Sequence, residues 1–227
     1  MAKKTSSSRR RSRPVSQKKN MPDKNILILA GIAVVIVLAV ASIVLLGGLD
    51  GVEDTNGAGI TGDKIAIIET SEGTIKVDLY EDKTPNTVQN FINYAEEDFY
   101  DGLVFHRVID GFMIQGGGFY PDGTQKETND AIDLEIHPDA RHVDGAIAMA
   151  RTSDPNSATS QFFINDGAQS QLEPGGVDPN GYAVFGVVID GMDIVSSISG
   201  VETTTKYRMQ NWPVEDVIIN NVTIENQ

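Results

Sequence analysis

Residues 105–118 read FHRVIDGFMIQGGG, and this stretch decides how the rest of the sequence is interpreted. On a β-strand, Phe105, Arg107 and Ile109 share one face, because successive side chains point to opposite faces. Arg107 therefore has apolar neighbours on its own face. It is either a solvated strand residue or a charged hydrogen-bond donor set beside a hydrophobic pocket, and the segments around it must decide between the two.

Short β-type runs lie on both sides of this stretch, and turn-forming residues separate them. The runs cover residues 65–68, 75–79, 103–109, 112–116, 145–150, 160–165, 182–189 and 214–225. Apolar residues at helical spacing predict a helix over 85–98, where Thr84 gives an N-cap and Pro85 a first-turn proline. A second, short helix is predicted at 191–199. Many short strands with two helices are typical of mainly β proteins and predict a closed antiparallel barrel.

The first 63 residues differ in composition from the remainder. Residues 1–25 form a Ser-, Arg- and Lys-rich tail with too few apolar groups to fold. Residues 26–46, ILILAGIAVVIVLAVASIVLL, have Ser42 as their only polar side chain. As a helix this segment spans roughly 30 Å, the thickness of the hydrocarbon core of a bilayer. Residues 47–63 are Gly-rich and acidic, as linkers often are, and residues 64–226 are long enough for one folded domain.

This order of segments predicts a single-span membrane anchor. Residues 1–24 carry nine basic side chains and one acidic side chain, whereas residues 25–227 carry nine basic and 31 acidic ones. The basic flank favours a cytoplasmic N-terminus close to anionic lipid headgroups, with the folded domain outside the cytoplasm. A cleaved signal peptide, which would release a secreted protein, is the alternative. The acidic body argues against nucleic acid as a partner.

Most reaction classes lack the residues that they need. The chain has no Cys, which excludes a disulfide framework, a thiolate nucleophile and a Cys-ligated zinc ion. The sequence motifs of serine hydrolases, zinc proteases, P-loop proteins and dinucleotide-binding proteins do not occur. His137 and His142 lie in a polar loop with Asp139 and Arg141, which predicts a solvated surface and not a metal site. We therefore expect neither a metal nor a cofactor.

Taken in order, the segments of the folded region resemble the cyclophilin-type peptidyl-prolyl cis-trans isomerases, in the form of the shorter prokaryotic members. The likeness runs from about Lys64 to Glu225 and includes the signature in residues 105–118. It continues through SATSQFFIN at 157–165 and AVFGVV at 183–188. The resemblance implies an eight-stranded antiparallel barrel with two helices capping its ends. It also implies an enzyme that accelerates rotation about X-Pro peptide bonds and assists protein folding.

The resemblance further implies which residues form the site. Arg107 is expected to be the catalytic hydrogen-bond donor, and Gln115 is expected to orient both the substrate and Arg107. The positions that the family uses to bind its substrate, including an apolar cup for the proline ring, are Phe112, Met113, Ala150, Arg151, Gln161, Phe163, Leu172 and Tyr182. We expect Arg151 to act through its backbone. Phe162 and Val184 alternate with the pocket residues and are assigned to the core.

Departures from the family pattern affect the expected ligands. Tyr182 stands where many eukaryotic members have a His. Gln171 replaces the tryptophan that many cyclosporin-sensitive members carry before the leucine, which predicts weak cyclosporin binding. The expected partners are proline-containing polypeptides and the lipid bilayer, through residues 26–46, and we expect a monomer. The alternative function is a tethered proline-binding or chaperone module with little or no isomerase activity.

Overall fold

The computed structural model describes residues 63–227 of the chain. The strands there are β1 (Lys64–Thr70), β2 (Gly73–Leu79), β3 (Arg107–Ile109), β4 (Met113–Gly116), β5 (Ala146–Met149), β6 (Phe162–Asn165), β7 (Val184–Asp190), β8 (Thr203–Lys206), β9 (Met209–Pro213) and β10 (Ile219–Asn226). The helices are α2 (Pro85–Glu96), the short 3-10 helix η1 (Ser170–Leu172) and α3 (Met192–Ser199). Both predicted helices and all eight predicted strands are confirmed, although the last six of those strands begin later than predicted.

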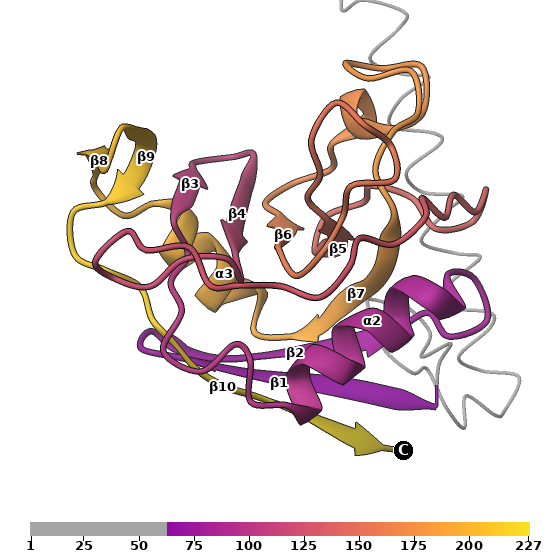
Figure 1. The fold of residues 1–227 in the computed structure, drawn as a ribbon, viewed down its shortest axis with the longest axis horizontal. Helices are drawn as coiled ribbons and strands as arrows, with labels where there is room; N and C mark the ends of the chain where they lie inside the picture. Colours follow the sequence, from indigo (N-terminus) through magenta and orange to yellow (C-terminus); the bar gives the residue numbers. More distant parts are fainter. Residues whose placement is uncertain (1–62) are drawn as a thin grey trace, which may run out of the picture. The chain divides into compact units, whose positions relative to one another are not determined.

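Eight strands form one antiparallel sheet in the order β10-β1-β2-β7-β5-β6-β4-β3. The sheet curls strongly (Figure 1), but it keeps two edges, β10 and β3, so the prediction of a closed barrel is wrong. A closed barrel needs continuous pairing between its first and last strands. Here β3 has only three residues, and the chain before it meets the chain before β10 in one isolated bridge, Val104 to Ile218. The result is a half-barrel.

The main core lies between helix α2 and the sheet, and aromatic rings dominate it. Phe91 points inward from α2, because its spacing from the other apolar residues of the helix places them on one face. Its ring centre lies 5.3 Å from that of Tyr100, 5.6 Å from that of Phe162 and 5.2 Å from that of Phe185. Phe162 and Val184 are both buried, as predicted.

The start of α2 is capped from a distant part of the chain. Thr84 occupies the N-cap position, as predicted. Its hydroxyl donates to the carbonyl of Val184 over 3.2 Å, however, and makes no capping hydrogen bond to the helix, so that part of the prediction is wrong. The carboxylate of Glu135 takes over that role and accepts the backbone N–H groups of Asn86, at 3.2 Å, and Thr87, at 2.6 Å. These are helix N–H groups that lack a partner within the helix. The loop that carries Glu135 is thereby held against α2.

A hairpin that the sequence did not predict lies beside β3. Strands β8 and β9 pair with each other in a separate two-stranded sheet, which stands next to β3 in Figure 1. Its turn residues Tyr207 and Arg208 have φ values of 52° and 69°, a left-handed conformation that glycine or asparagine usually adopts. The absence of those residues from the turn removed the usual hairpin signal.

The predicted tail, residues 1–25, the predicted membrane segment, residues 26–46, and the predicted linker up to residue 62 lie outside the described residues. In the part of the chain that the structure describes, neither α-helix combines the length and the apolar character that crossing a bilayer requires.

Candidate active site

Three neighbouring strands place predicted site residues in one row. Arg107 on β3 pairs with Gln115 on β4, and Gln115 pairs with Phe163 on β6. Residues directly opposite one another on antiparallel strands project from the same face, so these three side chains lie side by side. Met113 precedes Gln115 by two residues and therefore projects from that face as well. Strand register thus assembles a charged donor, an amide and apolar groups in one place.

These side chains line a cavity of about 300 Å³. The lining residues are Arg107, Phe112, Met113, Gln115, Ala150, Arg151, Phe163, Leu172, Val177 and Tyr182. The cavity therefore brings together every predicted site residue except Gln161. Gln161 lines a second hollow of about 350 Å³, which shares Gln115, Ala150 and Arg151 with the first. Val177 is a lining residue that sequence reasoning missed, because a valine between Gly176 and Asp178 carries no recognisable signal.

Hydrogen bonds join the polar groups of the two hollows. The Oε1 atom of Gln115 lies 3.4 Å from Nη1 of Arg107, and Nε2 of Gln115 donates to Oε1 of Gln161 over 3.0 Å. The backbone carbonyl of Gln161 accepts the N–H of Ala150 at 2.9 Å. Gln115 is therefore held from both sides, with its acceptor oxygen directed at the guanidinium of Arg107.

The Arg107 guanidinium has donors left for a ligand. Within residues 63–227, no carboxylate forms an ion pair with Arg107, and its contacts to Gln115 and to the sulfur of Met113, at 3.6 Å, are long. The side chain is half-buried, with its guanidinium carbon 5.9 Å from the ring centre of Phe112. Burial lowers the pKa of Arg107, and nearby Tyr182 opposes that change. An arginine remains charged in proteins, so the cavity contains a weakly satisfied cationic donor.

The apolar side of the cavity is built on Phe163. The ring of His142 stacks behind it with an interplanar angle of 3° and 6.0 Å between ring centres. The ring of Tyr182 meets Phe163 edge-on at 5.8 Å, and Leu172 adds a buried side chain from η1. His142 is itself buried, so the predicted solvated surface is wrong for this residue. Burial lowers the pKa of His142, which favours the neutral ring under the pocket.

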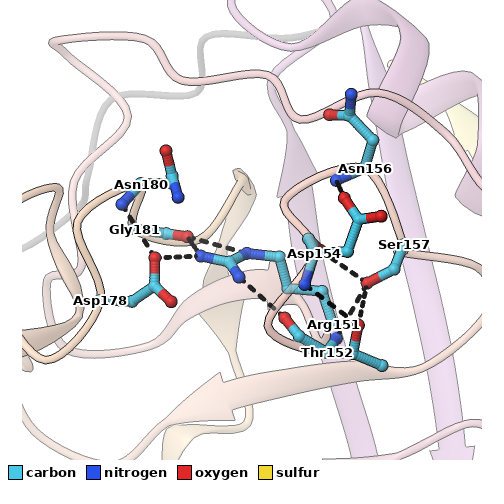
Figure 2. A network of polar contacts seen from close by, with 8 residues as sticks. All are labelled: Arg151, Thr152, Asp154, Asn156, Ser157, Asp178, Asn180 and Gly181. Atoms are coloured by element: carbon cyan, nitrogen blue, oxygen red, sulfur yellow. Dashed lines mark hydrogen bonds and ion pairs between the residues drawn. The ribbon is translucent and has the colours of Figure 1, made fainter.

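Arg151 is fixed by its side chain at the wall between the two hollows. Only 1% of that side chain is exposed, and its guanidinium donates to Oδ1 of Asp178 over 2.6 Å. Further donors reach the backbone carbonyls of Gly181, at 3.1 Å, and Thr152, at 2.8 Å (Figure 2). The guanidinium also lies over the ring of Tyr182, 4.6 Å from its centre. The side chain thus ties the loop of residues 173–181 to the site, while the expected role of the Arg151 backbone stays a prediction.

The fold and the site agree with one family of enzymes. Residues 65–224 match the family model described as cyclophilin type peptidyl-prolyl cis-trans isomerase/CLD. The chain therefore belongs to the cyclophilin family of peptidyl-prolyl cis-trans isomerases, and the resemblance stated from the sequence is confirmed.

Individual relatives are similar over nearly their whole length. Peptidyl-prolyl cis-trans isomerase B of Escherichia coli is 47% identical over 157 residues, which cover 68% of this chain and 96% of that protein. The isomerase cyp18 of Streptomyces antibioticus is 46% identical over 159 residues, which cover 69% of this chain and 96% of that protein. A crystal structure of a Cryptosporidium parvum cyclophilin in the presence of the dipeptide Ala-Pro has a TM-score of 0.62 and 28% identity, and the match covers 72% of this chain and 99% of that one.

Proposed function

We propose that this isomerase is anchored in a membrane and accelerates rotation of X-Pro peptide bonds in extracytoplasmic proteins. One observation carries the catalytic part of the proposal. Arg107 presents a charged donor, without an ion-pair partner among the described residues, inside a cavity of about 300 Å³ that has an apolar side. The apolar side suits a small apolar ring, and a free donor next to it suits the amide attached to that ring.

The reaction makes modest chemical demands. Amide resonance sets a rotation barrier of about 18–20 kcal/mol, and uncatalysed exchange of an X-Pro bond takes tens to hundreds of seconds. No covalent bond breaks during rotation. The site must therefore favour a twisted amide, in which resonance is lost and the nitrogen has regained a lone pair. A hydrogen-bond donor aimed at that nitrogen stabilises the twisted state more than the planar one.

We assign that donor role to Arg107 and an orienting role to Gln115. A hydrogen bond from a charged group contributes about 1.5–3 kcal/mol, which corresponds to roughly one to two orders of magnitude in rate. The bond between Gln115 and Gln161, 3.0 Å long, supports the orienting role because it keeps the Gln115 amide next to Arg107. Burial of the substrate and preorganised backbone contacts supply the remaining stabilisation.

The proline ring is assigned to the apolar cup of Phe112, Met113, Phe163 and Leu172. The stacking of His142 behind Phe163 supports this assignment, because it fixes the ring that forms the floor. Ala150, Arg151, Gln161 and Tyr182 are assigned to the neighbouring parts of the polypeptide substrate. The presence of an Ala-Pro dipeptide with the Cryptosporidium parvum relative supports a proline-containing ligand here.

The membrane part of the proposal rests on the sequence. Residues 26–46 form an apolar segment long enough to span a bilayer, and the preceding 25 residues are basic. This pattern supports a single-pass protein with a cytoplasmic N-terminus and an extracytoplasmic isomerase domain. Its clients would then be newly exported polypeptides that refold next to the membrane.

Two experiments test the proposal. The full-length chain, purified in detergent, should accelerate the slow refolding phase of a client whose folding is limited by prolyl isomerisation, in proportion to the amount added. Binding of proline peptides without acceleration would favour the tethered proline-binding module instead.

For localisation, membrane fractionation should recover the full-length chain with the membranes, and protease added outside the cell should digest the isomerase domain. Recovery of a shortened, soluble form alone would favour cleavage and secretion.

A further inference from the structure

Val177 is an apolar side chain left uncovered at the wall of the cavity. It is 69% exposed, the largest exposed fraction among the exposed large hydrophobic residues of the described part of the chain. It nevertheless lines the same cavity as Phe163 and Leu172. Apolar surface in such a place is stabilised when a ligand covers it, in proportion to the area removed from water. Exposed apolar surface beside a binding site is therefore a candidate contact for the ligand.

The loop that carries Val177 has a defined shape. The N–H of Val177 donates to the carbonyl of Gln171 over 2.8 Å, and the N–H of Gly175 donates to the carbonyl of Pro179 over 3.1 Å. The chain passes so close to Gln171 at residue 176 that a Cβ atom there would clash with the carbonyl oxygen of Gln171. Only glycine fits at such an approach, so Gly176 lets the loop turn back on itself before Val177.

Arg151 holds the far side of the same loop. Figure 2 shows its guanidinium beside Asp178 and Gly181, to which it donates hydrogen bonds. The Oδ1 atom of Asp178, which accepts from Arg151, also accepts the N–H of Asn180 at 2.8 Å. With its side chain 1% exposed, Arg151 has almost no freedom to move away from this loop. Asp178 follows Val177 directly, so a clamp on Asp178 also fixes where Val177 stands.

We propose that Val177 forms an apolar subsite for the side chain of a residue next to the substrate proline, and that Arg151 is the positioning residue that holds this subsite in place. The proposal rests on the proposed function, since it assigns a part of the same peptide substrate. Val177 lines the first hollow and is not among the residues that line the second. We therefore expect the subsite to contact one of the two residues that flank the proline and not both.

The test uses the full-length chain and two series of proline peptides. One series varies the residue before the proline from Gly to Ala to Leu, and the other varies the residue after it in the same way. Both kcat/KM for isomerisation and the Kd for peptide binding are measured. In the parent, peptides with Leu should be preferred over peptides with Gly in one of the two series. Val177→Ser should reduce that preference by about tenfold, which is the lower end of the range for an apolar contact in a binding pocket. The lower end applies because this pocket stays partly open.

The matched control is Val214→Ser, which changes a valine that is also exposed, at 38%, and lies outside both hollows. It should leave both series unchanged. If Val177→Ser behaves like this control in both series, the subsite is refuted. Because selectivity is read in binding as well as in turnover, a chain without catalytic activity would count against the isomerase proposal and would still test the subsite.

The positioning role of Arg151 is tested by a double-mutant cycle. Arg151→Lys keeps the charge but loses the forked contact to Asp178 and Gly181. It should reproduce the selectivity loss of Val177→Ser, whereas the double variant should lose no more than either single variant. Asp178→Asn, a milder change at the other end of the clamp, should shift selectivity in the same direction. Additive losses, or unchanged selectivity in Asp178→Asn, would show that Arg151 does not act through Val177.

Discussion

Burial of His106 makes the stability of the folded domain depend on pH. The residue is 4% exposed, and its ring lies 4.7 Å from that of Phe119 and 6.1 Å from that of Trp212, measured between ring centres. Its Nδ1 atom is buried and has no hydrogen-bond partner among the described residues. Burial lowers the pKa of His106 from 6.5 to about 4, a contact with the Val104 backbone opposes the change, and the charge of Arg107 adds to it.

The sign and size of the effect follow from the two pKa values. Above pH 6.5 the ring is neutral in both the folded and the unfolded chain, and the full stability is present. As the pH falls from 6.5 towards 4, the unfolded chain binds a proton that the folded domain does not, so stability is lost. The change from 6.5 to about 4 corresponds to roughly 3 kcal/mol of unfolding free energy, at 1.36 kcal/mol per pH unit.

The assay is urea unfolding of fragment 60–227 between pH 4 and pH 8. This fragment contains residues 65–224, the whole region that matches the family model. The fluorescence of Trp212, the only tryptophan, reports on the transition. From pH 7 to pH 4 the parent should lose about 3 kcal/mol more than His106→Phe, which packs a ring of similar shape and does not titrate. Other titrating groups, such as the buried His142, occur in both proteins and cancel in the difference. Parallel pH profiles for the two proteins would show that burial of His106 does not make the stability depend on pH.

Three further predictions concern the helix cap, the hairpin and ligand binding. Glu135→Ala should lower the unfolding free energy by about 1–2 kcal/mol in urea titrations, because N–H groups at the start of α2 lose their acceptor, and Glu135→Gln should recover part of the loss. Unchanged stability would contradict the capping role. Asp216→Ala should cost about 1–3 kcal/mol, since it removes the acceptor 2.7 Å from the buried Trp212 indole nitrogen, and hydrogen exchange should rise first in β8 and β9. Exchange that rises equally throughout the domain would argue against a local effect. Calorimetric titration should find weak cyclosporin binding to the parent and tighter binding to Gln171→Trp, whereas a nanomolar Kd for the parent would overturn that prediction.

The sequence predicted the parts of the site that local patterns control. Alternation on a strand placed Arg107 on one face. The family signature added Gln115, and the family segment at 157–165 added Phe163; the strand register sets the three side by side. The apolar spacing after Pro85 predicted helix α2. Strand alternation and helical spacing are both patterns of neighbouring residues, so both can be recognised in the sequence alone.

The features that were missed depend on contacts between distant residues. Glu135 caps a helix that begins 50 positions earlier in the chain, and nothing near Thr84 signals this. His142 lies among polar neighbours, yet its ring turns inward to stack on Phe163. Closure of the barrel failed as a prediction because strand patterns indicate where strands lie and do not show whether the two edge strands of a sheet pair with each other. Val177 belongs to the same group, since only the folded loop brings it to the cavity.

In the proposed mechanism, Arg107 catalyses prolyl rotation as a charged donor. The most direct measurement compares kcat/KM for isomerisation of a proline peptide by fragment 60–227, its Arg107→Ala variant and its Arg107→Lys variant, together with the peptide Kd of each. We predict that Arg107→Ala loses about ten- to 100-fold in kcat/KM while its Kd changes little, and that Arg107→Lys recovers part of the rate. Equal activity of the parent and Arg107→Ala, with both proteins folded, would show that Arg107 is not the catalytic donor and place the catalysis elsewhere in the cavity.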